Sequence, residues 1–241
     1  CKPQAGFRAL VRVDGRSMIP ALEALERLRE GNRHFVADIR RQKEIAPRRA
    51  ELAAGQEPFA IILGCSDSRV PAELIFDQGL GDLFVIRVAG NIVAPSQIGS
   101  VEFAAERFRT RLVVVVGHSS CGAITATLEK LARRNGLQSR NLRAIVDRIR
   151  PAVAPLLRTK LKDDYDALHG EAVRANVRVA ADHLRHGSEI LEHLIEREGL
   201  LIVGAEYSLE TGVVDFFDVP GVKPSRPKPR IRKRGPDRRG R

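Results

Sequence analysis

The segment that most constrains the fold is an unbroken apolar run, Leu112-Val113-Val114-Val115-Val116, near the middle of the 241-residue chain. All five residues are aliphatic, and no polar residue alternates with them. A strand of this kind is buried on both faces, which is typical of a parallel sheet covered by helices on each side. The run therefore predicts an α/β fold whose strands are joined by right-handed crossovers.

The rest of the chain alternates between strand-like and helix-like patterns. Strands are predicted at residues 59–64, 83–88, 112–117, 200–205 and 213–218. Helices are predicted at residues 20–39, 48–54, 72–77, 97–108, 122–134, 141–153, 165–185 and 188–198. We expect a mostly parallel central β-sheet of four to five strands flanked by helices, preceded by an N-terminal helical arm.

The positive charge of the chain is concentrated at its C-terminal end. Ten basic residues and one acid follow Val222, so this segment carries +9 of the net charge of +11, and the remaining body carries +2. Its Pro-, Lys-, Arg- and Gly-rich composition predicts a basic disordered tail at residues 222–241. Such a tail can bind polyanions non-specifically, and the absence of aromatic residues excludes base stacking. The predicted organisation is an N-terminal extension (1–17), a folded domain (18–221) and this tail.

Two short segments carry the chemistry, residues 65–69 (CSDSR) and 118–122 (HSSCG), and each directly follows a predicted strand. Two thiolates and an imidazole suit Zn²⁺, and three protein ligands leave one tetrahedral position open, as in catalytic zinc sites. Catalytic groups collect at the carboxyl ends of the strands in a parallel sheet. We therefore expect Cys65, His118 and Cys121 to converge if their strands are neighbours.

A carboxylate and a guanidinium lie beside the first of these ligands, at Asp67 and Arg69. A cation within a few ångströms favours the charged form of a carboxylate. The pair is therefore suited to orienting a nucleophile at the metal, although two such residues elsewhere in a sequence would more often form a structural ion pair.

Together these motifs resemble those of the β-class carbonic anhydrases. The resemblance covers about residues 18–221, with matching segments at 65–73 (CSDSRVPAE), 79–91 and 117–123 (GHSSCGA). It implies a zinc lyase with one Zn²⁺ per chain on Cys65, His118 and Cys121, which hydrates CO2 to bicarbonate and a proton by attack of zinc-bound hydroxide. It also implies that Asp67 and Arg69 are catalytic.

The resemblance extends to the substrate pocket and to the assembly. Gln56 matches a glutamine that hydrogen-bonds the substrate, Phe84 and Phe103 fall where the family lines its apolar pocket, and Gly122 follows the last ligand as in the family. The family builds its active site at a dimer interface, with pocket groups contributed across it. The resemblance thus implies an obligate homodimer or a higher even oligomer.

Two other functions and two locations stay open from the sequence. The same fold and metal site occur in CS2 and COS hydrolases, and a non-catalytic zinc-fold binding protein is a further alternative. A cytoplasmic location is expected, and no apolar run approaches the roughly 18 residues of a membrane span. The chain starts with Cys1 and has its one methionine at Met18, so a periplasmic or lipid-anchored form is the alternative if Cys1 is a processed N-terminus.

Overall fold

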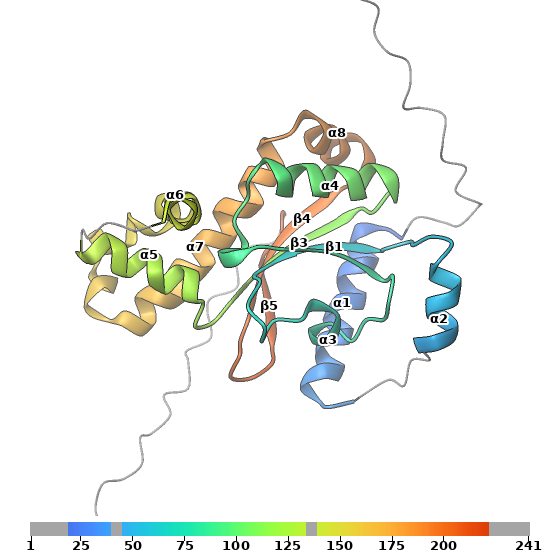
Figure 1. The fold of residues 1–241 in the computed structure, drawn as a ribbon, viewed down its shortest axis with the longest axis horizontal. Coiled ribbons are helices and arrows are strands. Elements are labelled where there is room, and N and C mark those ends of the chain that lie inside the picture. Colours follow the sequence, from blue (N-terminus) through green and yellow to red (C-terminus); the bar gives the residue numbers. More distant parts are fainter. Residues whose placement is uncertain (1–18, 40–44, 134–138, 222–241) are drawn as a thin grey trace, which may run out of the picture.

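Five strands form one sheet in the computed structural model, which describes residues 19–39, 45–133 and 139–221 (Figure 1). Their bounds are β1 Ala60–Gly64, β2 Leu83–Arg87, β3 Leu112–His118, β4 Leu201–Tyr207 and β5 Val214–Asp218. The order across the sheet is β2-β1-β3-β4-β5. The first four strands pair in parallel, and β5 pairs antiparallel with β4. The predicted mostly parallel sheet is confirmed.

The helices lie within a few residues of the predicted ranges. Their bounds are α1 Ala21–Val36, α2 Ile45–Leu52, α3 Ala72–Ile75, α4 Pro95–Arg107, α5 Gly122–Arg133, α6 Arg140–Val153, α7 Tyr165–His186 and α8 Glu189–Glu198. The described part of the chain also contains three short 3₁₀ helices that were not predicted, η1 Ala89–Asn91, η2 Leu156–Arg158 and η3 Lys160–Asp163. The extension at 1–17 and the tail at 222–241 lie outside the described residues, so both stay predictions.

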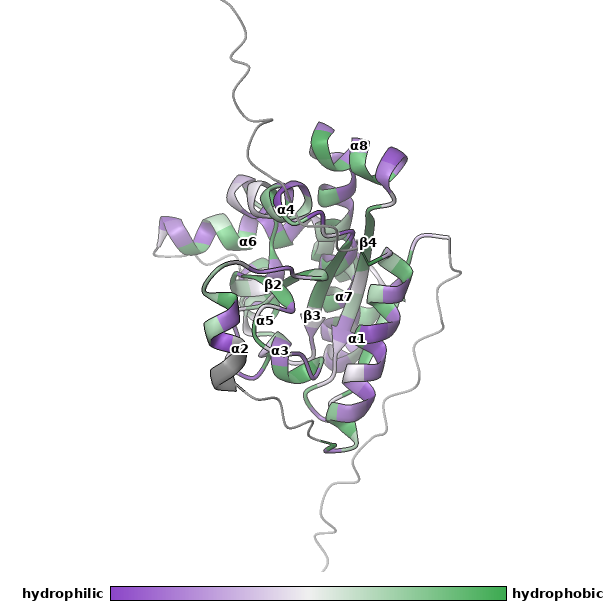
Figure 2. Ribbon diagram, turned by 90° about the vertical axis from the view of Figure 1, so that its right-hand side faces the viewer, coloured by the Kyte–Doolittle hydropathy of each residue, from purple (hydrophilic) through white to green (hydrophobic). Residues whose placement is uncertain are grey.

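The central strand β3 separates two apolar layers, as its unbroken run of valines predicts. Val114 and Val116 pack in a cluster with α1 and α3, whereas Val113 and Val115 pack in a cluster with α4, α7 and α8. Figure 2 shows these hydrophobic strands inside the molecule, with hydrophilic residues on the outer helix faces. No helix in the described part of the chain has both the length and the apolar character needed to cross a bilayer.

Helix α7 can approach the sheet closely because two strand positions lack side chains. A Cβ added at Gly117 would lie 2.6 Å from Val177 Cγ2, and one at Gly204 would lie 2.8 Å from Val177 Cγ1. Val177 is fully buried between these two glycines. The distance between α7 and strands β3 and β4 is therefore set by the missing side chains.

We predict that Gly117→Ala lowers the free energy of unfolding by about 1–3 kcal/mol, because the added methyl overpacks the interface with α7. Val177→Ala alone also destabilises, since it removes two buried methyl groups. The Gly117→Ala/Val177→Ala double variant should lose at least about 0.5 kcal/mol less than the sum of the single losses, because the second change opens space for the first. Urea unfolding of the metal-free proteins measures all three, and strictly additive losses would contradict this packing.

Candidate metal centre

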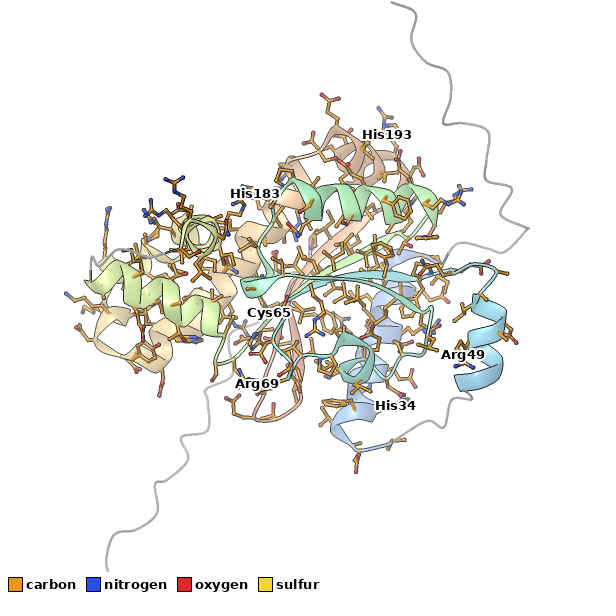
Figure 3. The ribbon with its side chains drawn as sticks, viewed as in Figure 1. His34, Arg49, Cys65, Arg69, His183 and His193 are labelled. Carbon is orange, nitrogen blue, oxygen red and sulfur yellow. The ribbon has the colours of Figure 1, made fainter. Side chains whose placement is uncertain are left out.

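Three side chains that could bind a metal meet at the carboxyl ends of neighbouring strands. Cys65 directly follows β1, His118 ends β3, and Cys121 precedes α5. β1 and β3 are adjacent and parallel, so the two strands that carry these residues are neighbours, as is required for the three side chains to meet. Their ligand atoms all lie within 4.8 Å of one another, and all three residues are buried. Figure 3 shows Cys65 close to the centre of the molecule.

The imidazole of His118 is oriented for a metal. Its Nδ1 lies 2.9 Å from the carbonyl oxygen of Ser119, which makes Nδ1 the protonated nitrogen and leaves a lone pair on Nε2. Nε2 is fully buried and has no hydrogen-bond partner in the described structure. A buried, unpaired acceptor of this kind is costly unless something binds it. A metal ion held with the two thiolates fills that role, so the residues fit zinc.

A hydrogen bond couples the two thiols. It lowers the pKa of the Cys65 thiol, and contacts with His118 and the Gly90 N–H, 3.3 Å from Sγ, act in the same direction. The same hydrogen bond raises the pKa of Cys121, and burial adds to the increase. The pair therefore favours the thiolate at Cys65 over the thiolate at Cys121, and metal binding requires both thiols to lose their protons.

Asp67 and Arg69 form a bidentate ion pair at the edge of this cluster. Arg69 Nε and Nη2 donate to the two carboxylate oxygens of Asp67 at 2.9 and 2.7 Å, and the Arg69 backbone N–H donates at 3.0 Å. These contacts hold the pKa of the Asp67 carboxyl well below its usual range. Asp67 Oδ2 also lies 4.0 Å from His118 Nε2. An ionised, acceptor-only group is therefore fixed beside the metal-facing nitrogen.

Two supports of this centre are not apparent in the sequence. Arg87, at the end of β2, donates to the carbonyl oxygens of Cys65 and Asp67 at 3.2 and 2.7 Å, and so fastens the loop that carries both residues. Gly90 has a φ of 70°, and a Cβ there would lie 2.8 Å from Ile149 and 2.9 Å from Ala123. Only glycine fits where its N–H reaches the sulfur. Each of these contacts joins residues 20 or more positions apart, so local sequence patterns do not reveal it.

The predicted pocket residues lie apart from the cluster, with one exception. Gly122 directly follows Cys121, and a Cβ there would meet nothing within 4 Å, so there is open space beside the ligand. Gln56 precedes β1, whereas Cys65 follows it, and this five-residue strand alone is about 16 Å long. Phe84 pairs in register with Ile61, about 13 Å along the strand from Cys65.

Phe103 belongs to a separate aromatic cluster with Phe84 and Phe108. The ring centroids lie 5.8–6.2 Å apart, in tilted and edge-to-face pairs. Phe103 projects from α4 and is 54% exposed. Within one chain, therefore, neither this cluster nor Gln56 lines the metal centre.

The comparisons with known proteins agree with this geometry. A family model described as carbonic anhydrase matches residues 60–214. The chain is 40% identical to carbonic anhydrase 2 of Mycobacterium tuberculosis over 192 residues, which cover 78% of this chain and 89% of that protein. It is 36% identical to the carbonic anhydrase of Mycolicibacterium smegmatis over 196 residues, which cover 80% and 91%.

Solved structures show the same fold. The β-carbonic anhydrase CcaA aligns with a TM-score of 0.60 at 28% identity, and the alignment covers 80% of this chain and 95% of that one. A β-carbonic anhydrase of Sordaria macrospora, described as tetrameric, aligns with a TM-score of 0.61 at 25% identity over 71% and 86% of the two chains.

We predict that Cys121→Ser abolishes stoichiometric zinc binding, because it leaves one thiolate and one imidazole around the ion. Metal content after dialysis against a weak chelator measures this, and near-UV circular dichroism reports whether the fold persists. Cys1→Ser is the matched control, since it also removes a thiol but changes none of the three proposed ligands, and it should leave zinc content unchanged. Full zinc content in the Cys121→Ser protein would contradict the ligand assignment.

Proposed function

The chain belongs to the β-class carbonic anhydrases, and from that premise we propose that Cys65, His118 and Cys121 hold its zinc ion while Asp67 and Arg69 act as its catalytic pair. The activity is the zinc-dependent, reversible hydration of CO2 to bicarbonate and a proton. The observation that carries the residue assignment is the buried Cys-His-Cys cluster whose unpaired Nε2 lies 4.0 Å from the Asp67 carboxylate. Neither CS2 or COS hydrolysis nor a non-catalytic role is favoured.

When zinc is bound, it lowers the pKa of water to near 7 and so makes a hydroxide nucleophile available at neutral pH. Asp67 can only accept hydrogen bonds, because Arg69 keeps it ionised. Its Oδ2 can thus take a hydrogen bond from the nucleophile and turn the nucleophile's free lone pair toward CO2. Arg69 is half exposed and fixes both carboxylate oxygens, while Arg87 fixes the backbone of Asp67.

We expect Asp67 and Arg69 to act as a unit in turnover. Asp67→Asn should lower kcat by about 100-fold or more, because the amide can donate to the nucleophile and misorient it. Arg69→Ala should have a comparable effect, and the double variant should be little worse than the worse single variant. Zinc content should stay close to one ion per chain in all three.

Stopped-flow CO2 hydration measures this cycle, with CS2 hydrolysis followed on the same samples. Glu171→Gln is the control, because it neutralises one partner of the Glu171–Arg178 ion pair on α7, and neither residue belongs to the proposed ligands or to the Asp67–Arg69 pair. Strictly multiplicative losses in the Asp67/Arg69 cycle would show that the two side chains act independently.

We further propose that Gln56, Phe84 and Phe103 serve the site of a partner chain in a homodimer or a higher even oligomer. The support is spatial: Gln56 is separated from its own Cys65 by the whole length of β1, and the aromatic cluster is partly exposed at the sheet edge formed by β2. Gly122 stays with the zinc of its own chain, where it leaves space for CO2. An apolar cluster that covers a partner's site would supply the dry wall that a small uncharged substrate requires.

Phe103→Glu should therefore weaken self-association and lower kcat/KM together, because it places a charge in the apolar contact. Leu142→Glu on α6 is the matched control, since Leu142 is 55% exposed and Phe103 is 54% exposed. Sedimentation velocity and CO2 hydration, measured over the same dilution series, test the coupling. A monomeric Phe103→Glu protein with full turnover would rule out the shared site.

Finally, we propose that residues 222–241 bind polyanions non-specifically and take no part in catalysis. A chain that ends at Val222 should keep its CO2 hydration rate but elute from a polyanion column at much lower salt, because it lacks a segment of net charge +9. A tail of equal length with its basic residues replaced by serine is the control for length. Loss of activity on truncation, or unchanged retention, would contradict the proposal.

The predicted cytoplasmic location and its alternative, a lipid on Cys1, are distinguished by cell fractionation with mass spectrometry of the N-terminal peptide.

A further inference from the structure

The turn between β4 and β5 holds the residue that follows the histidine ligand. Ser119 is buried and is bound both to the last residue of β4 and to this turn. Its backbone N–H donates to the carbonyl of Tyr207 at 3.0 Å. Its hydroxyl donates to Glu210 Oε2 at 2.8 Å and accepts from the Leu209 N–H at 2.9 Å. The serine is therefore fixed in both its backbone and its side-chain orientation.

The fixed serine in turn orients the imidazole. With its N–H and hydroxyl engaged by the turn, the Ser119 carbonyl points at His118 Nδ1, 2.9 Å away. The next residue, Ser120, has a φ of 55°, in the left-handed region that residues other than glycine rarely adopt. Such a conformation persists where the surrounding contacts hold it in place. The bonds to the β4–β5 turn supply that restraint at the entry to the ligand segment.

Glu210 is well suited to this role because a carboxylate accepts hydrogen bonds without donating any. Its Oε2 accepts from the hydroxyl of Ser208 at 3.1 Å as well as from Ser119. Hydrogen bonds to a charged acceptor are stronger than neutral ones. The direction of the Ser119 hydroxyl is therefore determined, since it must donate to Glu210 while it accepts from the backbone.

We propose that Glu210 is a positioning residue for the metal: through Ser119, it holds the imidazole of His118 with Nε2 directed at the two thiolates. The inference rests on the proposed metal centre. Glu210 acts at one remove, because its effect on the imidazole passes through its hydrogen bond to Ser119. Its loss allows the Ser119 carbonyl and the ring to adopt other orientations, so the free chain no longer presents a preformed site. The effect is on metal affinity and on ligand geometry, and turnover changes as a consequence.

Removal of the carboxylate tests the proposal directly. Glu210→Ala should raise the zinc dissociation constant about 10-fold, the lower end of the range for groups that support a ligand. Competition with a chromogenic chelator measures this constant without any assay of activity. The visible absorption bands of the cobalt-substituted protein should shift or broaden in the same variant, since they report ligand geometry. Glu210→Gln keeps an oxygen that can accept from Ser119 and should restore most of the affinity.

Two further variants separate positioning from simple loss of stability. Thr211→Ala changes the same turn through a side chain that accepts from the Val213 N–H and is not bonded to Ser119 or His118, and it should leave the affinity and the cobalt spectrum unchanged. Ser119→Ala breaks the same link from its other end, and the Ser119→Ala/Glu210→Ala double variant should bind zinc about as tightly as the weaker single variant. Ser119→Ala also provides the test if Glu210→Ala does not fold.

Failure of this inference and failure of the proposed metal centre give different results. Wild-type affinity and an unchanged cobalt spectrum in Glu210→Ala, or in Ser119→Ala if the former does not fold, would overturn the inference. So would equal losses in Glu210→Ala and Glu210→Gln, or an equal loss in Thr211→Ala. If the wild-type chain itself bound no zinc, the proposed metal centre would fail instead, and this result is visible before any variant is compared.

Discussion

The register of β3 against its neighbours is the constraint on which the metal centre depends. Gly64 lies opposite Val116, so Cys65 and His118 emerge at the same edge of the sheet. A slip of one residue would turn every side chain of β3 to the opposite face. The valine run cannot prevent such a slip, because it is apolar on both faces. Gly117 can prevent the slip, because a side chain brought to its place in β3 would collide with Val177 of α7. A packing requirement 60 residues away in the sequence thus fixes where the histidine ligand lies.

A thiol, an imidazole and a partly exposed carboxylate lie close together at this edge of the sheet. Removing such groups from water costs free energy unless each has its own partner. Here each receives one from a different segment: the Gly90 N–H for Cys65, the Ser119 carbonyl for His118, and the Arg69 guanidinium for Asp67. Cys65, His118 and the Asp67 carboxylate are therefore oriented before any metal arrives. His118 Nε2, which is buried and has no hydrogen-bond partner in the described part of the chain, is the atom that a metal would use.

The sequence was sufficient to predict the strands, their mostly parallel pairing and the convergence of Cys65, His118 and Cys121. These rest on local signals: long apolar runs, and cysteine and histidine directly after them. The contacts of Arg87 with two backbone carbonyls, and of Glu210 with Ser119, could not be predicted in this way. In each case the partner is either a backbone atom or a residue far along the chain, and residue type does not identify it. Gln56, Phe84 and Phe103 were named from a resemblance, and only the structure shows that they lie away from their own chain's zinc ligands.

This separation has a consequence for how assembly relates to chemistry. The proposed metal ligands and the Asp67–Arg69 pair all belong to one end of one sheet, so under this proposal a single chain contains what it needs to bind zinc. The proposed apolar wall is at the other end of β1 and on the edge strand β2, where an unpaired edge and a half-exposed Phe103 both favour a covering partner. Zinc affinity should then be independent of protein concentration, whereas turnover should fall as the oligomer dissociates. Under this proposal the chain binds its metal alone and becomes an enzyme by association, because the part of the pocket that excludes water would come from a second copy.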